Sequence, residues 1–546
     1  MTTDALSLYH TESAKGCFWS TANVGEALPG VVTPFGWSVW GPAIDLGMKD
    51  AFRQTGALEP ERVVFNPEAD KRAVTVFHGR GALSVNFLCE MGNRLPGTSS
   101  DAIAKQLLGE MPVGIQIPQT GKRNAAIARN MPRTFARIRK EALRDTAHTQ
   151  AWWQAHIRAM PTRDMAATKA ALDDARKEMC AMTAIQARAV FVGVQSIYDQ
   201  LLALIAKTDI TPEQANALMA GQGSHAETEI IADLWALGRD QMTLEAFNDK
   251  HGYHGLGEGQ LIAKMWREDP EPVLRLAKQY AARPDSEHPH LMAEQRTRER
   301  IAAEKALLAK TPIYKRPIAK QILKLSVARI PLRGVAKEAL IRCLDVCRAA
   351  ARRMGTLLVE QGVIDEVDDV FYFTADELIA GLPANAKELA AERKALREEL
   401  LKIDIPRTWE GTPPKLTISE SAAAAAAAPE PTVGDVAVTG IGASGGVVEG
   451  NARVVFDPTE VDVEPGDIIV APTTDPSWAA VLFLAEALVV DIGGPLSHAA
   501  VVARECGIPC VIGTDNGTAV LRTGDTIRVD GNKGTVEILS RAQAAV

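Results

Sequence analysis

Three features that mark membrane, secreted or nucleic-acid-binding proteins are missing from this sequence of 546 residues. The longest apolar run, residues 478–490, is too short to cross a bilayer and contains Glu486. Residues 1–15 have no basic segment followed by an apolar core, so no secretory signal is expected. Positive charge is not in excess, because 60 basic and 68 acidic side chains give a net charge of −8. We therefore expect a cytoplasmic protein that binds neither nucleic acid nor a membrane.

Cysteine is also scarce, and its spacing is not that of a disulfide framework. The seven cysteines are an odd number; Cys343 and Cys347 fit one helical pattern, and Cys506 and Cys510 flank a turn. This arrangement favours free thiols over disulfides or zinc, and no metal site is predicted. The sequence also lacks a Gly-rich loop ending in Lys-Ser or Lys-Thr, so it offers no Walker-type nucleotide site.

The length predicts two to four domains, because one hydrophobic core does not grow to this size. Near the start of the chain, a hairpin is predicted from strands at 74–77 and 82–87. From about 101 to 401 the apolar spacing is helical, with long helices predicted at 166–205 and 331–360 and breaks near 221–223 and 251–259. Residues 1–409 are thus predicted to form a mainly α-helical substrate domain with a small N-terminal β-containing part.

Residues 410–432 differ in composition from both flanks. They contain a Pro pair, seven consecutive alanines at 422–428 and then Pro-Glu-Pro, and their only large apolar side chains are Leu416 and Ile418. We interpret the segment as a linker, part helical and part extended; the alternative is a helix that packs through its alanines. Fully extended, about twenty residues at about 3.3 Å each span roughly 65 Å, which lets a tethered domain visit two places.

After this linker, residues 433–546 alternate short strands with short helices. Strands are predicted at 466–470, 487–490 and 509–512, helices at 476–484 and 497–506, and a final hairpin at 525–529 and 535–539. This alternation is typical of a compact α/β domain.

The most informative segment joins a predicted strand to a predicted helix. Gly493 and Gly494 permit backbone torsions and close approaches that a side chain would block. Ser497 is a natural N-cap, so His498 lies in the first turn, beside the unpaired N–H groups and the positive end of the helix dipole. A neutral imidazole is a nucleophile near pH 7, and a helix N-terminus stabilises the charge of a bound phosphate. His498 is therefore predicted to accept a phosphoryl group; the alternative is a structural histidine.

The pattern Gly-Gly-x-x-Ser-His-Ala-Ala-x-x-Ala-Arg-Glu at 493–505, followed by Gly-Ile-Pro, resembles the swivelling phosphohistidine domain of the phosphoenolpyruvate-utilising enzymes. The likeness covers about residues 433–539 and implies that His498 is the residue that is phosphorylated. Pro495 and Leu496 stand where the family has smaller or polar residues, and this departure does not affect the chemistry.

Residues 19–38 resemble the start of the substrate-binding domain of rifampin phosphotransferases, and the likeness continues through Arg333, Lys337 and residues 361–374. It implies an Arg-Lys pair near the histidine. At this spacing both side chains point from one helical face and could neutralise a transferring phosphoryl group; the alternative is a solvated basic face.

Residues 251–258 resemble a family turn usually written Gly-His-Arg-Gly-Pro-Gly-Glu, with Tyr253 and His254 at the His-Arg positions.

Val24, Leu28, Phe35, Trp37 and Trp40 are the candidates for an apolar wall that binds the acceptor. Such a wall suits a hydroxyl compound with a phenolic or polycyclic body. The alternative is that these side chains belong to the ordinary core.

Two domains of the family are not found in the sequence, the ATP-grasp domain and the pyruvate-binding barrel of pyruvate phosphate dikinase. In this respect the chain is similar to phenylphosphate synthase, in which a phosphohistidine subunit and an ATP-binding subunit cooperate. The likeness implies that a separate ATP-grasp subunit binds ATP and Mg²⁺. It also implies that ATP, acceptor and water give AMP, phosphate and the phosphorylated acceptor through a phosphohistidine intermediate.

The leading hypothesis is a phosphotransferase component. In it, His498 carries a phosphoryl group from the ATP-using partner to a hydroxyl held in the helical domain. Two alternatives stay open: a phosphocarrier or regulatory protein that passes phosphate to another protein, and a phosphotransferase that uses phosphoenolpyruvate as its donor.

Overall fold

A computed structural model describes residues 5–542, except 22–23, 97, 109–110, 118–122, 221, 223–224, 418–432, 457–462, 465, 475–477 and 495–496. The chain forms two compact units from segments that are far apart in sequence. Unit 1 comprises Met1–Ser196, Gly259–Ala263 and Leu332–Ile418, and unit 2 comprises Ile197–Glu258, Lys264–Pro331 and Ser419–Val546. The predicted fold class is confirmed: helices dominate, with a small N-terminal sheet and a mixed C-terminal sheet. The three-part division at 409 and 432 stays a prediction, because the units group residues by contact alone.

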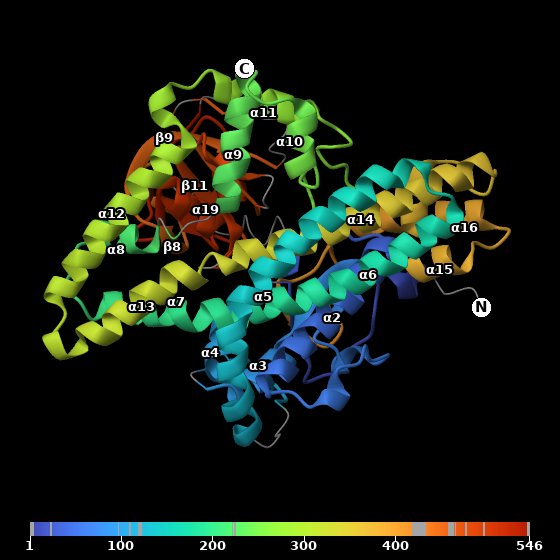
Figure 1. Ribbon diagram of the computed structural model, residues 1–546, viewed down its shortest axis with the longest axis horizontal. Helices are drawn as coiled ribbons and strands as arrows, with labels where there is room; N and C mark the ends of the chain where they lie inside the picture. The colour runs from blue at the N-terminus through green and yellow to red at the C-terminus, as the bar shows by residue number, and fades with distance from the viewer. Residues whose placement is uncertain are drawn as a thin grey trace. The chain divides into compact units, whose positions relative to one another are not determined.

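Long helices build the core of unit 1: α2 (Pro34–Thr55), α5 (Asn124–Ala159), α6 (Met165–Arg188) and α14 (Leu332–Glu360). Figure 1 shows α5, α6 and α14 side by side. Side-chain caps fix two of the helix starts, since Thr33 accepts a hydrogen bond from the Gly36 N–H and Asp164 accepts one from the Ala167 N–H. Shorter helices complete the unit: α1 (Val24–Ala27), α3 (Val85–Arg94), α4 (Ser100–Leu108), α15 (Ala375–Ala380) and α16 (Ala386–Leu401).

The helix predicted at 166–205 is confirmed, but it is not uniform. α6 passes into a π-helical turn, Ala189–Val194, and then into α7 (Gln195–Ala206). By length and composition the whole run Met165–Ala206 could cross a membrane, with a mean hydropathy of 1.6 in its most apolar window. Long core helices of soluble proteins meet the same criterion, so the run is weak evidence for a span.

A four-stranded sheet in unit 1 has the order β2–β3–β1–β5, from β1 (Phe18–Ser20), β2 (Val74–Phe77), β3 (Arg80–Ser84) and β5 (Thr408–Glu410). The hairpin predicted at 74–87 is confirmed in its turn, where His78 and Gly79 adopt φ of +47° and +77°. Its second strand is shorter than predicted. Ser84 Oγ accepts a hydrogen bond from the Phe87 N–H and starts α3, so residues 85–87 are helical.

The first part of the predicted linker is strand rather than free chain. Glu410 ends β5, and β6 (Leu416–Thr417) pairs with β4 (Ile403–Asp404). The extended state predicted for part of the segment is therefore held by backbone pairing, which needs no large apolar side chain. Residues 418–432, including the alanine run, lie outside the described residues.

Unit 2 combines a group of helices with the C-terminal sheet. Its helices are α7, α8 (Pro212–Met219), α9 (His225–Gly238), α10 (Leu244–His251), α11 (Glu271–Ala281), α12 (Pro289–Lys310) and α13 (Arg316–Arg329). The breaks predicted near 221–223 and 251–259 are confirmed, since α8 ends at Met219 and α10 at His251. Figure 1 shows α9 in front of the strands of the sheet and of α19 (His498–Cys506).

The sheet of unit 2 has eight strands in the order β7–β14–β13–β9–β10–β11–β12–β8. Four central strands are parallel: β9 (Val447–Val454), β10 (Asp467–Ala471), β11 (Ala487–Val490) and β12 (Cys510–Ile512). The outer strands pair antiparallel: β7 (Val436–Thr439), β8 (Ile441–Ser444), β13 (Thr526–Asp530) and β14 (Thr535–Ser540). Short helices α18 (Ala479–Leu482) and α20 (Gly517–Val520) complete this part.

Alternation along the parallel strands divides the apolar side chains between two cores. Ile468 and Val470 face one core, shared with β13 and β14, and Ile469 and Ala471 face the other, shared with α19. Strands buried on both faces read as continuous apolar runs, which is why the sequence predicted β10, β11 and β12 correctly.

Candidate active site

The candidate site lies where the parallel strands of unit 2 end. β11 ends at Val490, a turn follows, and Ser497 starts α19 by accepting a hydrogen bond at Oγ from the Ala500 N–H over 3.3 Å. The helix ends at Gly507, whose φ of 72° is left-handed. In open α/β sheets, ligands bind in the crevice outside the carboxyl ends of the strands. The predicted cap and helix therefore deliver His498 to the edge at which this architecture binds ligands.

His498 is held by a residue that the sequence analysis missed. The Nδ1 atom of His498 lies 3.1 Å from Oγ1 of Thr474, which follows β10 by three residues. Both residues are buried, with 7% of His498 and 2% of Thr474 exposed. With Nδ1 engaged by a hydroxyl, Nε2 is the ring nitrogen positioned to act as nucleophile. The one signal for Thr474 in the sequence was its place just after a buried strand, and that position is shared by many structural residues.

The two glycines before the helix differ in what they do. A Cβ on Gly493 would lie 3.1 Å from Oγ of Ser497, so this glycine keeps the cap accessible. A Cβ on Gly494 would meet nothing within 4 Å. Neither glycine is among the described residues with a left-handed φ. The expectation of special torsions was therefore wrong for both, and the expected close approach holds at Gly493 alone.

Asp491 fixes the turn that leads to the helix. Its carboxylate accepts hydrogen bonds from Oγ1 of Thr514 over 2.7 Å and from Oγ1 of Thr518 over 2.5 Å. The Thr518 N–H also donates to it, and only 5% of Asp491 is exposed. These bonds tie the ends of β11 and β12 to α20, so the base of the site is rigid. This network was also missed, because its partners lie more than twenty residues away in the sequence.

The face of α19 opposite the sheet is covered by helices of the same unit. α9 and α11 pack on α18 and α19 through a continuous apolar cluster that includes Trp235, Leu276, Val481 and Val502. The cluster buries α19 along most of its length and leaves His498 largely enclosed. The His498 ring is therefore largely inaccessible to a ligand in this arrangement.

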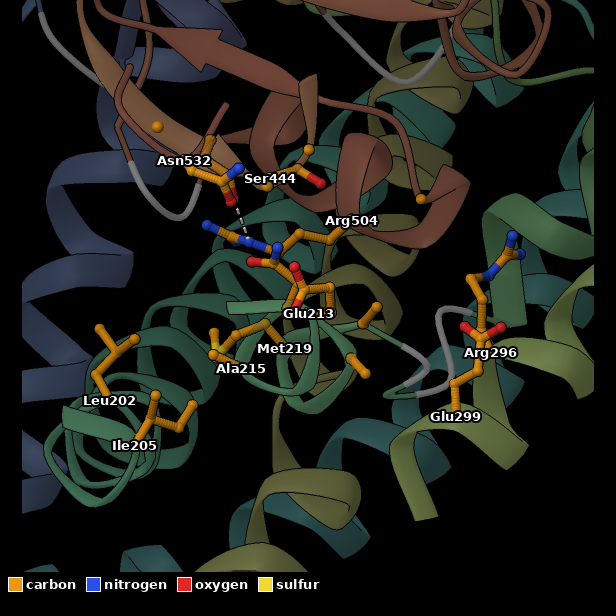
Figure 2. Close-up of a pocket in the computed structure, with 18 of the residues that line it drawn as sticks. Leu202, Ile205, Glu213, Ala215, Met219, Arg296, Glu299, Ser444, Arg504 and Asn532 are labelled. Carbon is orange, nitrogen blue, oxygen red and sulfur yellow. Dashed lines mark hydrogen bonds between the residues drawn. The ribbon is translucent and has the colours of Figure 1, made fainter. Parts of the chain in front are cut away.

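The other end of α19 borders a cavity of about 590 Å³, shown in Figure 2. α7 contributes Leu202 and Ile205, and α8 contributes Glu213 and Met219. Figure 2 shows Glu213 and Arg504 pointing toward one another across it.

Arg504 itself is anchored by a 2.7 Å hydrogen bond from Nε to the carbonyl of Ala443, and its guanidinium lies 5.8 Å from the Tyr198 ring. Arg504 lies seven residues after the Ser497 cap, which is about 10 Å at about 1.5 Å per residue. The cavity is thus away from the nucleophile, and Arg504 points away from the phosphate position, as its place in the last turn predicts.

The residues predicted to bind the acceptor all belong to unit 1, whereas His498 belongs to unit 2. Arg333 and Lys337 lie half-buried in the first turns of α14. The five apolar candidates, Val24, Leu28, Phe35, Trp37 and Trp40, are buried except for Trp37, which is partly exposed. Phe35 packs edge-on against Phe371, and Nε1 of Trp40 donates to the Gly259 carbonyl over 2.8 Å. Their assignment as an acceptor wall stays a prediction.

The family-like turn at 251–258 forms two histidine–carboxylate hydrogen bonds, one buried and one partly buried. Nε2 of His251 lies 2.8 Å from the Asp233 carboxylate, and Nδ1 of His254 lies 2.9 Å from that of Glu258. Burial is the main cause that lowers the pKa of His251 below its ordinary value. The His254 ring also packs against Trp266. These contacts brace the turn between α10 and α11.

Comparisons with known proteins match two regions of the chain. Residues 463–534 match the mobile domain of PEP-utilising enzymes, and residues 239–334 match the fourth domain of rifampicin phosphotransferase. A rifampicin phosphotransferase of Streptomyces sviceus is 33% identical over 309 residues, which is 54% of this chain and 34% of that protein. An uncharacterised protein of Mycobacterium tuberculosis is 36% identical over 53% of this chain and 30% of its own length. An uncharacterised phosphotransferase of Bacillus subtilis is 36% identical over 35% of this chain and 23% of its own length.

These alignments span about a third or less of the relatives' own lengths. The first matched region lies in unit 2 and contains His498, and the second lies mostly in unit 2, with residues 259–263 and 332–334 in unit 1. The chain therefore contains one region similar to the mobile domain of PEP-utilising enzymes, as the signature around His498 predicted, and one region similar to the fourth domain of rifampicin phosphotransferase.

Proposed function

We propose that this protein is a phosphotransferase component that carries a phosphoryl group on Nε2 of His498. The donor is a separate ATP-grasp subunit that binds ATP and Mg²⁺, and the acceptor is the hydroxyl of an apolar small molecule, phenolic or polycyclic. The observation that supports the proposal is the position of His498 in the fold. Its ring lies at the start of α19, on the carboxyl edge of the parallel strands, with Nδ1 held by Thr474.

Two displacements at phosphorus make up the proposed reaction. In the first, the lone pair of Nε2 forms a P–N bond while the P–O bond to the donor's leaving oxygen breaks. In the second, the acceptor oxygen forms a P–O bond, the P–N bond breaks and returns its electron pair to Nε2, and the hydroxyl proton passes to solvent. Water cleaves the other phosphoanhydride bond of ATP at the donor subunit, so that over the full cycle ATP, acceptor and water give AMP, phosphate and phosphorylated acceptor. The N-terminus of α19 stabilises the negative charge of the intermediate by about 0.3–1 kcal/mol or more where solvent is excluded.

Movement of the mobile domain is part of this proposal. His498 is 7% exposed, so neither a donor nor an acceptor reaches its ring in the described arrangement. Arg333 and Lys337 belong to the other unit, and we propose that the open domain presents phosphohistidine to them. Their two cations neutralise the equatorial oxygens of the phosphoryl group as it transfers.

The test is a transfer assay with the full chain loaded chemically. Potassium phosphoramidate, a reagent that phosphorylates histidine, replaces the unidentified partner, and His498→Gln treated in the same way corrects for phosphate carried on other histidines. The loaded protein is freed of reagent and incubated with a panel of phenols, polycyclic alcohols and macrocycles, and products are identified by mass spectrometry. A phosphorylated small molecule appearing as the protein loses its phosphoryl group supports the proposal. If the protein-bound phosphoryl group is lost only to water across the whole panel, the proposed acceptor class is contradicted. If the loaded protein phosphorylates pyruvate, and does not form ATP from AMP and phosphate, phosphoenolpyruvate is favoured as the donor.

Thr474→Val is expected to slow loading of His498. The change removes the hydroxyl that holds Nδ1, worth about 1 kcal/mol or about fivefold in rate, while it keeps the side-chain shape. Thr474→Ser keeps the hydroxyl and should stay within about twofold of wild type. Rates of phosphoryl gain are measured by intact mass at neutral pH. Equal rates for the valine and wild-type proteins would show that Thr474 does not orient the ring.

The double variant Arg333→Gln, Lys337→Gln is expected to load normally and to transfer slowly. Removal of charge stabilisation from the second step should reduce the transfer rate about a hundredfold. Lys320→Gln, Lys324→Gln is the matched control, because these exposed lysines have the same spacing on α13. The rates of loss of protein-bound phosphate in the presence of an acceptor from the panel are compared. A transfer rate equal to that of the control variant assigns Arg333 and Lys337 to a solvated face.

A further inference from the structure

Unit 1 contains a cavity of about 420 Å³ whose walls are α2, α5 and the end of α6. Arg53, Arg133, Arg137 and Arg188 line it, and Glu141 is the one acidic side chain among the lining residues. Four guanidinium groups therefore face a single carboxylate. The rest of the chain does not share this bias, since its net charge is −8. A local excess of positive charge in an acidic protein indicates a place that attracts an anion.

Arg188 forms the fixed floor of this arginine cavity. It is 7% exposed, and its Nη1 donates to Oε1 of Gln54 and to Oε2 of Glu141, both over 2.7 Å. Gln54 is fixed in turn, because its backbone carbonyl accepts from Oγ1 of Thr134 over 2.9 Å. Arg188 is also the last residue before the π-helical turn Ala189–Val194. Such turns occur frequently at functional sites, where they re-aim a side chain.

Arg133 and Arg137 are the adaptable part of the cavity. They lie one turn apart on α5, so both point from one face of the helix. Within the described part of the chain, neither guanidinium has a hydrogen bond or an ion pair, and both are exposed. Two like charges at this spacing repel one another. Arg53 adds a third guanidinium, whose one partner among the described residues is Asp50 of its own helix. An anion between them relieves the repulsion.

We propose that the arginine cavity binds a small molecule through a phosphate or pyrophosphate group. The planar, forked guanidinium matches phosphate oxygens in pairs, and four of them on three helices can surround a group with several oxygens. The hollow shape favours a small molecule over an extended polyanion such as a nucleic acid. The site lies in unit 1, whereas His498 lies in unit 2, so the inference does not depend on the proposed phosphoryl transfer.

The binding test uses the full chain and three probes: inorganic phosphate, pyrophosphate and ADP. Isothermal titration calorimetry at low ionic strength should give saturable one-to-one binding of pyrophosphate to the wild type. Arg133→Gln, Arg137→Gln should weaken that binding about tenfold or more. Arg139→Gln, Lys140→Gln is the control, because it removes the same charge from exposed positions of α5 that do not line the cavity. Tighter binding of ADP than of pyrophosphate identifies a nucleotide as the source of the phosphate.

A second variant tests the sign of the electrostatic effect. Glu141→Gln removes the one lining carboxylate and should tighten pyrophosphate binding, about threefold or more. Circular dichroism checks that each variant stays folded. The proposal is overturned by absence of saturable binding to the wild type at millimolar probe, by equal weakening in the Arg139 and Lys140 control, or by weaker binding to Glu141→Gln.

Discussion

His498→Gln abolishes phosphoryl uptake by the full chain, with an expected fall of at least about a hundredfold in the rate of loading by the native donor. The amide side chain keeps a polar atom near Thr474 and fills most of the space of the ring, so the fold is preserved. It offers no lone pair that can form a stable bond to phosphorus. The measurement is intact mass at neutral pH before and after mild acid, which cleaves phosphohistidine. The wild type gains one acid-labile phosphoryl group, and the variant gains none.

The matched control for this variant is His290→Gln. His290 is exposed at the start of α12, so a non-specific phosphorylating agent reaches it more easily than the enclosed His498. Phosphorylation by the native donor depends on the position of the histidine at the start of α19, beside Thr474, rather than on how exposed the ring is. The His290 variant should therefore load at the wild-type rate. An acid-labile phosphoryl group that persists in His498→Gln contradicts the assignment of the nucleophile.

The second large effect is on stability: Asp345→Asn is expected to lower the free energy of unfolding of unit 1 by about 3–5 kcal/mol. Asp345 and Arg348 are both fully buried on α14, with 3.0 Å between Oδ1 of Asp345 and Nη1 of Arg348. Nε1 of Trp153 donates to the second carboxylate oxygen over 2.8 Å. The amide removes the negative charge that faces the buried Arg348 guanidinium.

Urea unfolding followed by tryptophan fluorescence measures this loss, since Trp153 contacts the altered side chain. Asp365→Asn is the control in the same unit. Asp365 pairs with Lys387 over 2.6 Å, but both side chains are exposed, and such pairs contribute about 0–1 kcal/mol. If both variants lose the same free energy of unfolding, burial does not determine how much the Asp345–Arg348 pair contributes to stability, and the prediction is wrong.

The parts of the fold that follow from local rules were predictable. The helix at 332–360 and the cap at Ser497 were expected in nearly their observed places, because apolar period and side-chain capping act within a few residues. The error at residues 85–87 has a local cause as well. An apolar run of this length suits either state, and the Ser84 cap decided for the helix. The strands at 408–417 were missed because they depend on distant partners, Phe18–Ser20 and Ile403–Asp404.

The residues of the candidate site likewise fall into those that local sequence predicts and those that depend on distant contacts. His498 could be identified because glycine, cap and histidine are contiguous in the sequence. Thr474 and Asp491 could not, because each acts through a contact across the sheet edge that no spacing encodes. The cover formed by α9 and α11 is equally non-local, since residues 230–280 contact residues 481–503 through side chains of ordinary core type. Arg188 in the arginine cavity depends on the π-helical turn, for which the sequence carried no signal.

The enclosure of His498 links two equilibria. In the proposed cycle, phosphorylation places about two negative charges on the buried ring of His498, and an enclosed dianion is far less well solvated than an exposed one. Loading the ring therefore weakens the closed arrangement, and discharging it restores that arrangement. By reciprocity, anything that holds the helices apart must favour the charged state of the ring by the same free energy. In the proposed cycle the phosphoryl group on His498 thus favours opening of the unit, and its transfer to the acceptor favours closure.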